Sequence, residues 1–204
     1  DPVMDGPVIQ EASRRALVDG ATPSIVLGIV KQAWLGVPVA VMTYANPVWH
    51  AGLEAFCDAC VDAGVSGVIV PDLPVDEASE WRNACSEASV APVFLAAPGS
   101  PEQRLRAIGE ASRGFVYCVA TYGVTGERER LAPTAAELVA RLRVLTDRPL
   151  LVGVGIAEPS QAAKACAFAD GVVVGSALVR PLLEADAAAA LRLAGAFRAA
   201  IDTT

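Results

Sequence analysis

Short apolar runs rich in valine alternate with longer, alanine-rich stretches along this chain, and this alternation leaves few folds open. The runs carry almost no charge and are apolar on both faces, which is typical of strands buried in a parallel sheet. Because no hairpin signal separates them, we expect right-handed crossovers and an α/β fold. The expected strands cover residues 39–44, 67–70, 93–96, 114–120, 150–153 and 171–174.

The stretches between these runs predict helices. Ser100-Pro101-Glu102 offers an N-cap followed by proline at the first helical position, and Glu158-Pro159-Ser160-Gln161 offers a second polar start. The expected helices cover residues 52–63, 75–88, 101–111, 133–146, 160–169, 177–183 and 187–201.

The positions of the glycines distinguish an open sheet from a closed barrel. An open nucleotide-binding sheet usually carries a glycine-rich turn after its first strand, and none follows residues 39–44. Glycines gather instead after the last two expected strands, at Gly153, Gly155 and Gly175. A phosphate-binding cup after strands 7 and 8 is common in (β/α)8 barrels. We therefore expect a TIM barrel of the phosphate-binding type.

Counting back from that cup makes residues 39–44 the third strand. We expect residues 1–204 to form a single domain, the C-terminal three-quarters of a (β/α)8 barrel, with strands 3–8 present and strands 1–2 missing from this sequence. Six strands alone would leave two apolar edges and an open core, and a complete barrel typically needs about 250 residues. A natural six-strand remnant is the alternative.

Composition and charge narrow the range of functions. Hydrophobic residues make up 53% of the chain, which excludes intrinsic disorder. A formal charge of −7 disfavours nonspecific binding to nucleic acid, but backbone N–H groups can still bind a small phosphate ester. No apolar run is long enough for a membrane span, and the acidic opening is unlike a signal peptide.

Five scattered cysteines favour free thiols in a reducing cytosol over a disulfide framework, so we expect a cytoplasmic protein. Cys57 and Cys60 have the spacing of a redox or metal pair, but they lie in a helical pattern without a second pair, which favours buried thiols. His50 is the single histidine, and no metal is expected.

Glycines and a serine at the last two strand ends form the strongest candidate site. Gly155 follows one strand, and Gly175 and Ser176 follow the next and open a short helix. Glycine lets backbone N–H groups approach a phosphate closely, and a helix N-terminus adds unpaired donors. The alternatives are tight packing at the strand end for Gly153 and Gly155 and a simple turn with a helix cap at Gly175 and Ser176.

Two further segments could carry chemistry. Residues 117–126 leave a strand, and the charged residues 127–132 could close as a lid, with Thr125 positioning a carboxylate and Gly126 donating to phosphate. An ordinary surface loop is the alternative. Asp5 lies in a stiff opening turn at the expected active-site end of the barrel, and a turn-forming aspartate is the alternative there.

In order and spacing, these segments and two further motifs resemble the tryptophan synthase α subunit family over essentially the whole chain. The motifs are Asp1-Pro2 with Asp5-Gly6-Pro7, Met42-Thr43-Tyr44-Ala45-Asn46-Pro47, Val70-Pro71-Asp72-Leu73-Pro74, Gly123-Val124-Thr125-Gly126, and the Gly155 and Gly175-Ser176 cup. The resemblance implies a carbon–carbon lyase of tryptophan biosynthesis that splits indole-3-glycerol phosphate into indole and D-glyceraldehyde 3-phosphate. It also implies that the chain itself uses no cofactor or metal. Indole would pass to a β subunit, which carries its own pyridoxal phosphate, in an αββα heterotetramer.

The resemblance also implies roles for single residues. Asp5 matches the catalytic aspartate, Tyr117 an active-site tyrosine, and Thr125 the lid threonine that bonds the aspartate. The other matches are phosphate ligands (Gly126, Gly155, Gly175 and Ser176), strand-end residues near the indole pocket (Tyr44 and Asp72), and residues that face the β subunit (Asp1, Pro2, Asn46, Pro47 and Pro74).

Departures from the family pattern bear on activity. The family's second catalytic carboxylate, a strand-2 glutamate, would precede Asp1 and lies outside this sequence, so we expect negligible lyase activity from these residues alone. Thr121 and Tyr122 replace a pair that is often basic and small at the start of the lid. A non-catalytic α-like barrel that binds and activates a β subunit is the alternative function. A metal-dependent epimerase is disfavoured because His50 is the single histidine.

Overall fold

The computed structural model describes residues 5–33, 36–119, 133–153 and 155–202. Every strand pairing in this part of the chain is parallel, in the order β1-β2-β3 and β4-β5-β6-β7. The prediction of an α/β fold with parallel sheets is therefore confirmed. The strands are β1 (Val39–Met42), β2 (Val65–Ile69), β3 (Ala91–Val93), β4 (Leu95–Ala96), β5 (Val116–Val119), β6 (Leu150–Gly153) and β7 (Gly171–Val172).

The single strand expected at residues 93–96 is split into β3 and β4 at Phe94. The Phe94 N–H donates to the buried hydroxyl of Ser112 at 3.3 Å, while the Phe94 carbonyl accepts from the Tyr117 N–H at 3.0 Å. The Ser112 hydroxyl thus accepts the hydrogen bond that a neighbouring strand would otherwise accept, so the strand hydrogen-bond ladder is interrupted at Phe94.

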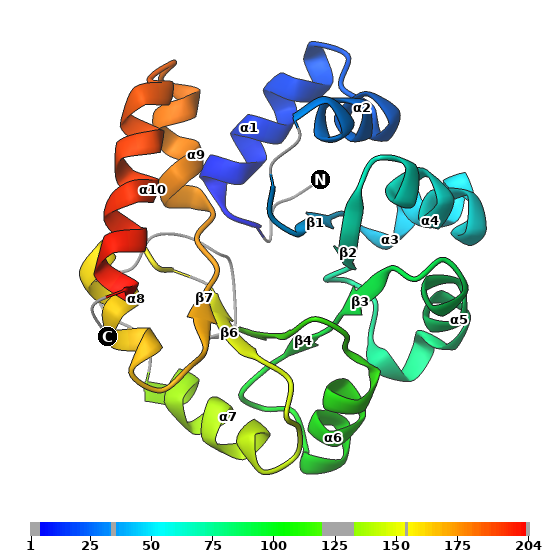
Figure 1. The fold of residues 1–204 in the computed structure, drawn as a ribbon, viewed down its shortest axis with the longest axis vertical. Helices are drawn as coiled ribbons and strands as arrows, with labels where there is room; N and C mark the ends of the chain where they lie inside the picture. Colours follow the sequence, from blue (N-terminus) through cyan, green and yellow to red (C-terminus); the bar gives the residue numbers. More distant parts are fainter. Residues whose placement is uncertain (1–4, 34–35, 120–132, 154, 203–204) are drawn as a thin grey trace.

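Helices occupy the outside of the molecule and the strands lie towards its centre (Figure 1). The predicted helix over residues 75–88 is a short 3-10 helix followed by α5, and no helix was predicted for α1, α2 and α3. The helices are α1 (Pro7–Val18), α2 (Pro23–Ala33), α3 (Ala45–Ala51), α4 (Leu53–Asp62), η2 (Val75–Glu77), α5 (Ser79–Glu87), α6 (Glu102–Ala111), α7 (Pro133–Arg143), α8 (Pro159–Cys166), α9 (Ser176–Leu183) and α10 (Ala187–Ile201).

Of the two predicted helix starts, the polar start at Glu158 is found and the N-cap at Ser100 is not. At α8, Glu158 and Gln161 form a capping box, in which the Gln161 side-chain oxygen accepts from the Glu158 N–H at 3.0 Å. At α6 the expected N-cap Ser100 is wrong by one residue. Pro101 is the N-cap because its backbone is extended, with φ −65° and ψ 156°, so the helix begins at Glu102.

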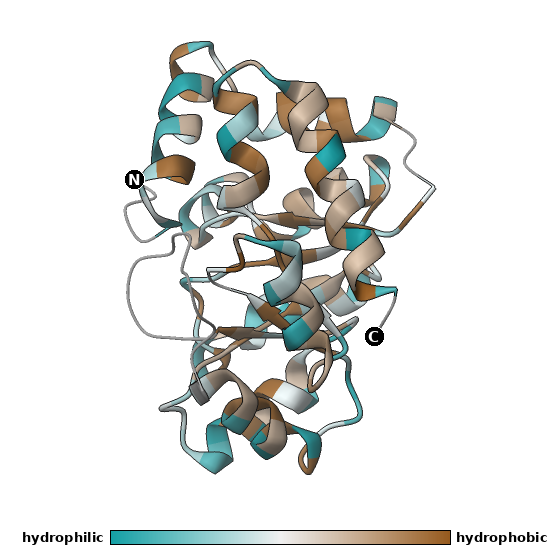
Figure 2. Cartoon of the chain, turned by 90° about the vertical axis from the view of Figure 1, so that its left-hand side faces the viewer, coloured by the Kyte–Doolittle hydropathy of each residue, from teal (hydrophilic) through white to brown (hydrophobic). Residues whose placement is uncertain are grey.

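The main core lies between the strands and the helices that follow them. Its fully buried side chains include Trp81 of α5, Leu105 of α6, Leu138 and Leu142 of α7 and Val116 of β5. Figure 2 shows the same arrangement from the side, with apolar strands crossing the centre of the molecule. This burial holds the strand ends in fixed positions, which is the geometry that a site at those ends requires.

The first two helices are much less buried. Within the described residues α1 and α2 have no fully buried side chain, and Leu17, Ile25 and Ile29 are each more than half exposed. Strand β1 alternates between intermediate and exposed residues. One edge of β1 and one edge of β7 have no strand partner in this part of the chain.

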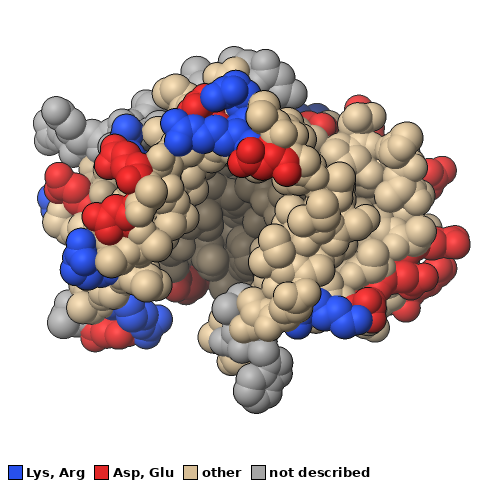
Figure 3. Space-filling view, turned by 90° about the horizontal axis from the view of Figure 1, so that it is seen from above, with Lys and Arg blue, Asp and Glu red and all other residues tan. Residues whose placement is uncertain are grey.

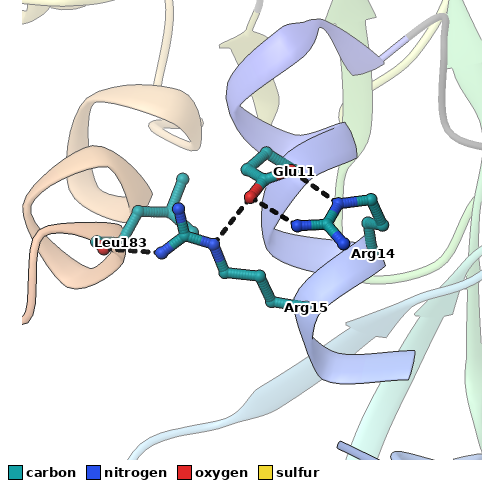
Figure 4. Close-up of polar contacts among 4 residues, drawn as sticks. All are labelled: Glu11, Arg14, Arg15 and Leu183. Carbon is teal, nitrogen blue, oxygen red and sulfur yellow. Dashed lines mark hydrogen bonds and ion pairs between the residues drawn. The ribbon is translucent and has the colours of Figure 1, made fainter. Parts of the chain in front are cut away.

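A hydrogen bond from an arginine that is ion-paired within α1 attaches α1 to α9. Glu11 accepts hydrogen bonds from Arg14 and Arg15, and Arg15 also donates to the Leu183 carbonyl at 2.8 Å, at the C-terminal end of α9 (Figure 4). The contact joins the last turn of α1 to the C-terminal end of α9, two helices from opposite ends of the described chain.

All five cysteines are free thiols, and Cys57 and Cys60 are fully buried, which confirms the interpretation of this pair as core residues. Burial raises the pKa of the Cys60 thiol to about 11. Among the described helices none has the length and apolar character needed to cross a membrane.

Candidate functional site

A cavity of about 640 Å³ lies at the carboxyl ends of the strands. Its wall comes from α1, α2, β1 and β5 and from the turns that follow β2, β6 and β7, so it draws on both ends of the described chain. The space-filling view in Figure 3 shows a hollow bordered mainly by uncharged residues. Parallel strands place all their carboxyl ends on one side of a sheet, which is where α/β proteins usually bind ligands.

Asp5 supplies a carboxylate to this cavity. The Tyr44 hydroxyl, just beyond the end of β1, donates to Asp5 Oδ2 at 2.5 Å. Burial, followed by the hydrogen bond to Asp5, raises the pKa of Tyr44, so the phenol stays protonated and remains a donor. In the described part of the chain no other donor to this carboxylate is found.

Tyr117 of β5 lies on the opposite wall, with 8% of its surface exposed. Burial raises its pKa to about 12, and the negative charge of Asp5 adds to this shift. A Cβ atom at Gly153 of the adjacent strand β6 would overlap the Tyr117 ring. Glycine at position 153 therefore leaves room for the Tyr117 ring. This is the tight packing at the strand end that was the alternative role for these glycines.

Gly155, Gly175 and Ser176 line the same cavity from the turns after β6 and β7. Gly155 has a φ of 86°, a conformation that glycine adopts without strain. A Cβ atom at Gly175 would meet no protein atom within 4 Å, so internal packing does not require glycine there. Ser176 begins α9, whose first amides lack helical acceptors. The two turns thus open to one space, as an anion cup requires.

The remaining predicted residues lie at the margin of the cavity or outside it. Pro47 of α3 is one of the lining residues, whereas Asn46 and Pro74 are exposed beyond it. Asp72 is exposed as well, and its carboxylate accepts a hydrogen bond from the Ala45 N–H at 2.9 Å, at the start of α3. This geometry gives Asp72 a structural contact at the rim.

Several predicted residues lie outside the described part of the chain. They are Asp1, Pro2, Thr121, Tyr122, Thr125, Gly126 and the rest of the expected lid at 127–132.

Sequence reasoning missed the apolar wall of the cavity. Ile9, Ser13 and Leu17 of α1 and Val26 and Leu27 of α2 line it. The available signal was Gly6-Pro7, a helix start with proline at the first position, followed by apolar residues at helical spacing.

The site thus combines one carboxylate, two phenols and two glycine turns with apolar walls. Such a cavity can hold a flat apolar group beside Asp5 and an anion at the turns, and it can exchange a proton with the carboxylate. No group of three or more potential metal ligands occurs in the part of the chain that the structure describes.

Comparisons with known proteins identify the family. The family model described as "Tryptophan synthase alpha chain" matches residues 1–198. A tryptophan synthase alpha chain from Streptomyces avermitilis is 45% identical over 192 residues, which is 93% of this chain and 69% of the relative. One from Prochlorococcus marinus is 42% identical over 200 residues, which is 97% of this chain and 73% of the relative.

Solved structures show the same similarity in three dimensions. A chain of Mycobacterium tuberculosis tryptophan synthase superimposes with a TM-score of 0.92 at 43% identity, covering 98% of this chain and 77% of its own. A chain of the tryptophan synthase complex from Pyrococcus furiosus gives a TM-score of 0.86 at 33% identity, covering 98% and 82%.

Proposed function

This chain belongs to the tryptophan synthase alpha chain family, and from that membership we propose that it cleaves indole-3-glycerol phosphate into indole and D-glyceraldehyde 3-phosphate. The observation that carries the proposal is the shared cavity, in which the Asp5 carboxylate stands with the Gly155 turn and the Gly175-Ser176 turn. The phosphate would bind at the two turns, and the indole would lie against the apolar wall beside Asp5.

The reaction is a retro-aldol cleavage that needs only proton transfers. A proton added at C3 of the indole gives an indolenine, and Asp5 Oδ1 favours this tautomer by accepting the proton of the ring N–H. The hydroxyl on the adjacent glycerol carbon then loses its proton, and the carbon–carbon bond breaks. The bond's electron pair returns to the ring as the aldehyde forms. Because acid–base catalysis by proton transfer is enough to promote the cleavage, we propose that the chain uses no cofactor or metal of its own.

Tyr44 and Tyr117 would support Asp5 in different ways. Tyr44 fixes the carboxylate through Oδ2, while Tyr117 lies across the cavity and confines the indole. Thr125 and Gly126 would complete the site from the lid, the first by bonding Asp5 and the second by donating to phosphate.

The parallel strands would belong to a closed (β/α)8 barrel. The unpaired edges of β1 and β7 and the exposed apolar side chains of α1 and α2 support this, because further strands would pair the edges and cover those residues. The proposed acid and base for C3 and the glycerol hydroxyl, a glutamate, would lie on such a strand. A polypeptide limited to these 204 residues is therefore expected to show negligible turnover.

We further propose that the chain works with a β subunit in an αββα assembly, where indole passes to a site containing pyridoxal phosphate. Its contact surface would include Asp1, Pro2, Asn46, Pro47 and Pro74. Exposed Asn46 and the 42% exposed Trp49 on α3 support an interface at the rim of the cavity, because an exposed tryptophan beside polar residues is typical of protein contacts.

The test is release of glyceraldehyde 3-phosphate from indole-3-glycerol phosphate by the full-length protein, with and without the β subunit. We expect slow release alone and faster release in the complex. Asp5→Asn should lower kcat by about 100-fold to 10,000-fold with little change in KM, because general acid–base catalysis is worth that much. Gly175→Val should mainly raise KM, because its side chain would fill the cup.

Gly195→Ala is the matched control, since its added Cβ also meets no atom within 4 Å but lies on α10, away from the cavity. Full turnover by Asp5→Asn would remove Asp5 from the mechanism. An unchanged KM in Gly175→Val would show that the phosphate binds elsewhere.

A further inference from the structure

A second pocket, of about 540 Å³, lies at the opposite end of the sheet from the proposed active site. Its floor includes Ala91 and Pro92, the first residues of β3, whereas the first cavity is lined by residues such as Thr43 and Pro71 that follow strand ends. One side of the pocket is the outer face of α5, and the other is the turn between α6 and β5. The two pockets share no lining residue.

The polar side chains that line this second pocket can all donate hydrogen bonds. Arg82 of α5 and Arg113 of the α6–β5 turn both line it, and no aspartate or glutamate does so in the described part of the chain. The other polar lining residues carry hydroxyl or amide groups: Ser79, Asn83, Ser86 and Ser89. Such a set matches an anion with several acceptor oxygens.

Neither arginine has a carboxylate partner among the described residues. On the neighbouring helix α6, by contrast, Arg104 contacts Asp76 at 2.8 Å and Arg106 contacts Glu102 at 3.4 Å. Two unpaired guanidinium groups at one pocket stand out in a chain whose formal charge is −7, because carboxylates are plentiful elsewhere on it. The pocket therefore offers local positive charge that the fold leaves unneutralised.

Arg113 is held in place before any ligand arrives. Its Nη1 donates to the carbonyls of Glu110 and Ser112 at 2.8 and 3.1 Å, and its backbone N–H donates to the Pro92 carbonyl at 2.8 Å. The bonds fix one corner of the guanidinium and leave its other N–H groups for a ligand. A side chain fixed in this way loses little conformational freedom on binding.

Ser89 adds a hydroxyl group to this pocket. It follows α5 with a φ of 59°, in the left-handed region where glycine is the usual residue at a helix end. A serine in this region strains the backbone, as does Ala185 after α9, with a φ of 60°. The Ser89 hydroxyl is what a glycine would lack.

We propose that the pocket formed by α5, the start of β3 and the α6–β5 turn is a binding site for a phosphate-class dianion, either inorganic phosphate or a small organic phosphate monoester. The two guanidinium groups supply the charge, and the surrounding hydroxyls and the Asn83 amide supply further donors. This site is separate from the proposed lyase site and does not depend on it.

Amide chemical shifts of the full-length protein during titration with inorganic phosphate and, separately, with glycerol 3-phosphate test the proposal. We expect saturable shifts at residues 82–90 and 111–113, distinct from any at Gly155 and Gly175. Loss of a charged hydrogen-bond partner should weaken Kd at least about tenfold in Arg82→Ala and in Arg113→Ala. Arg106→Ala, an arginine that already has a carboxylate partner, should bind as the wild type does.

The Ser89→Gly variant distinguishes loss of binding from loss of folding. This variant should bind phosphate more weakly while its thermal midpoint stays level or rises, because the strained φ is relieved. Tighter binding of glycerol 3-phosphate than of phosphate would identify an organic ester as the ligand, and equal binding would identify phosphate itself. The proposal is overturned if the shifts fail to saturate, or if they are the same in the Arg82→Ala/Arg113→Ala double variant.

Discussion

The Asp5–Tyr44 contact sets the chemistry of the site at the scale of single residues. The 2.5 Å hydrogen bond occupies Oδ2 and orients the carboxylate at the wall of the cavity. Because burial and the neighbouring negative charge keep Tyr44 protonated, it donates this bond throughout the physiological pH range. Tyr44 is thus a positioning residue in this account, and its effect on turnover should act through Asp5.

Tyr44→Phe tests that dependence. Loss of a hydrogen bond to a charged group is worth about 1.5 to 3 kcal/mol, so kcat should fall by roughly 10-fold to 100-fold while KM changes less. In an Asp5→Asn background the same substitution should have little further effect, because the group it positions is gone. Equal losses in both backgrounds, measured by product release, would show that Tyr44 acts independently of Asp5.

The packing of Tyr117 against Gly153 leads to a second prediction at the residue scale. Gly153→Val would drive a side chain into the space of the Tyr117 ring, so we expect lower turnover and a lower thermal midpoint. Gly28→Ala on exposed α2 is the control, because its Cβ would meet no atom within 4 Å and alanine favours a helix. If Gly153→Val kept both properties at wild-type values, the packing of Tyr117 on Gly153 would be wrong.

At the scale of elements, the ion pairs of Glu11 within α1 should show themselves in the pH dependence of stability. Hydrogen bonds from Arg14 and then Arg15 lower the pKa of Glu11 from 4.5 to about 2. A lowered pKa in the folded state means that the charged form stabilises the fold. The contribution is therefore complete above pH 4.5 and is lost as the pH falls towards 2.

Glu11→Gln should accordingly lower the thermal midpoint slightly at neutral pH, and its difference from the wild type should vanish as the pH falls through that range. The effect should be small and weakened by salt, because the partners are exposed. Glu137→Gln, which removes an exposed glutamate of α7, serves as the control. A Glu11→Gln difference that persists below pH 2 would contradict the ionic explanation.

The elements that sequence reasoning found and missed have physical explanations. Buried strands were recognised because a parallel sheet demands runs of apolar residues, as in β6. Helix α1 was not expected because its start, Gly6-Pro7, was interpreted as part of a stiff opening turn, although apolar residues at helical spacing follow it. The break at Phe94 depends on the Ser112 hydroxyl, 18 residues away in sequence, and no local pattern reveals it.

At the scale of the whole molecule, parallel topology explains why part of the site was predictable. Gly155 and Gly175 could be placed together because both follow the carboxyl ends of strands, and Asp5 was expected at the same face and lines the same cavity. Two features became visible only in the three-dimensional structure: the free space around a Cβ at Gly175 and the packing of Tyr117 against Gly153. The rim position of Asp72 also needed it, since its partner Ala45 is 27 residues away in sequence.

The most direct measurement is a crystal structure of the full-length protein with a non-cleavable indole phosphate ester. The account predicts phosphate oxygens within hydrogen-bonding distance of the Gly155 and Gly175 amides and of the Ser176 hydroxyl, with the indole N–H directed at Asp5. A phosphate bound away from these turns, or an indole ring out of reach of Asp5, would contradict it.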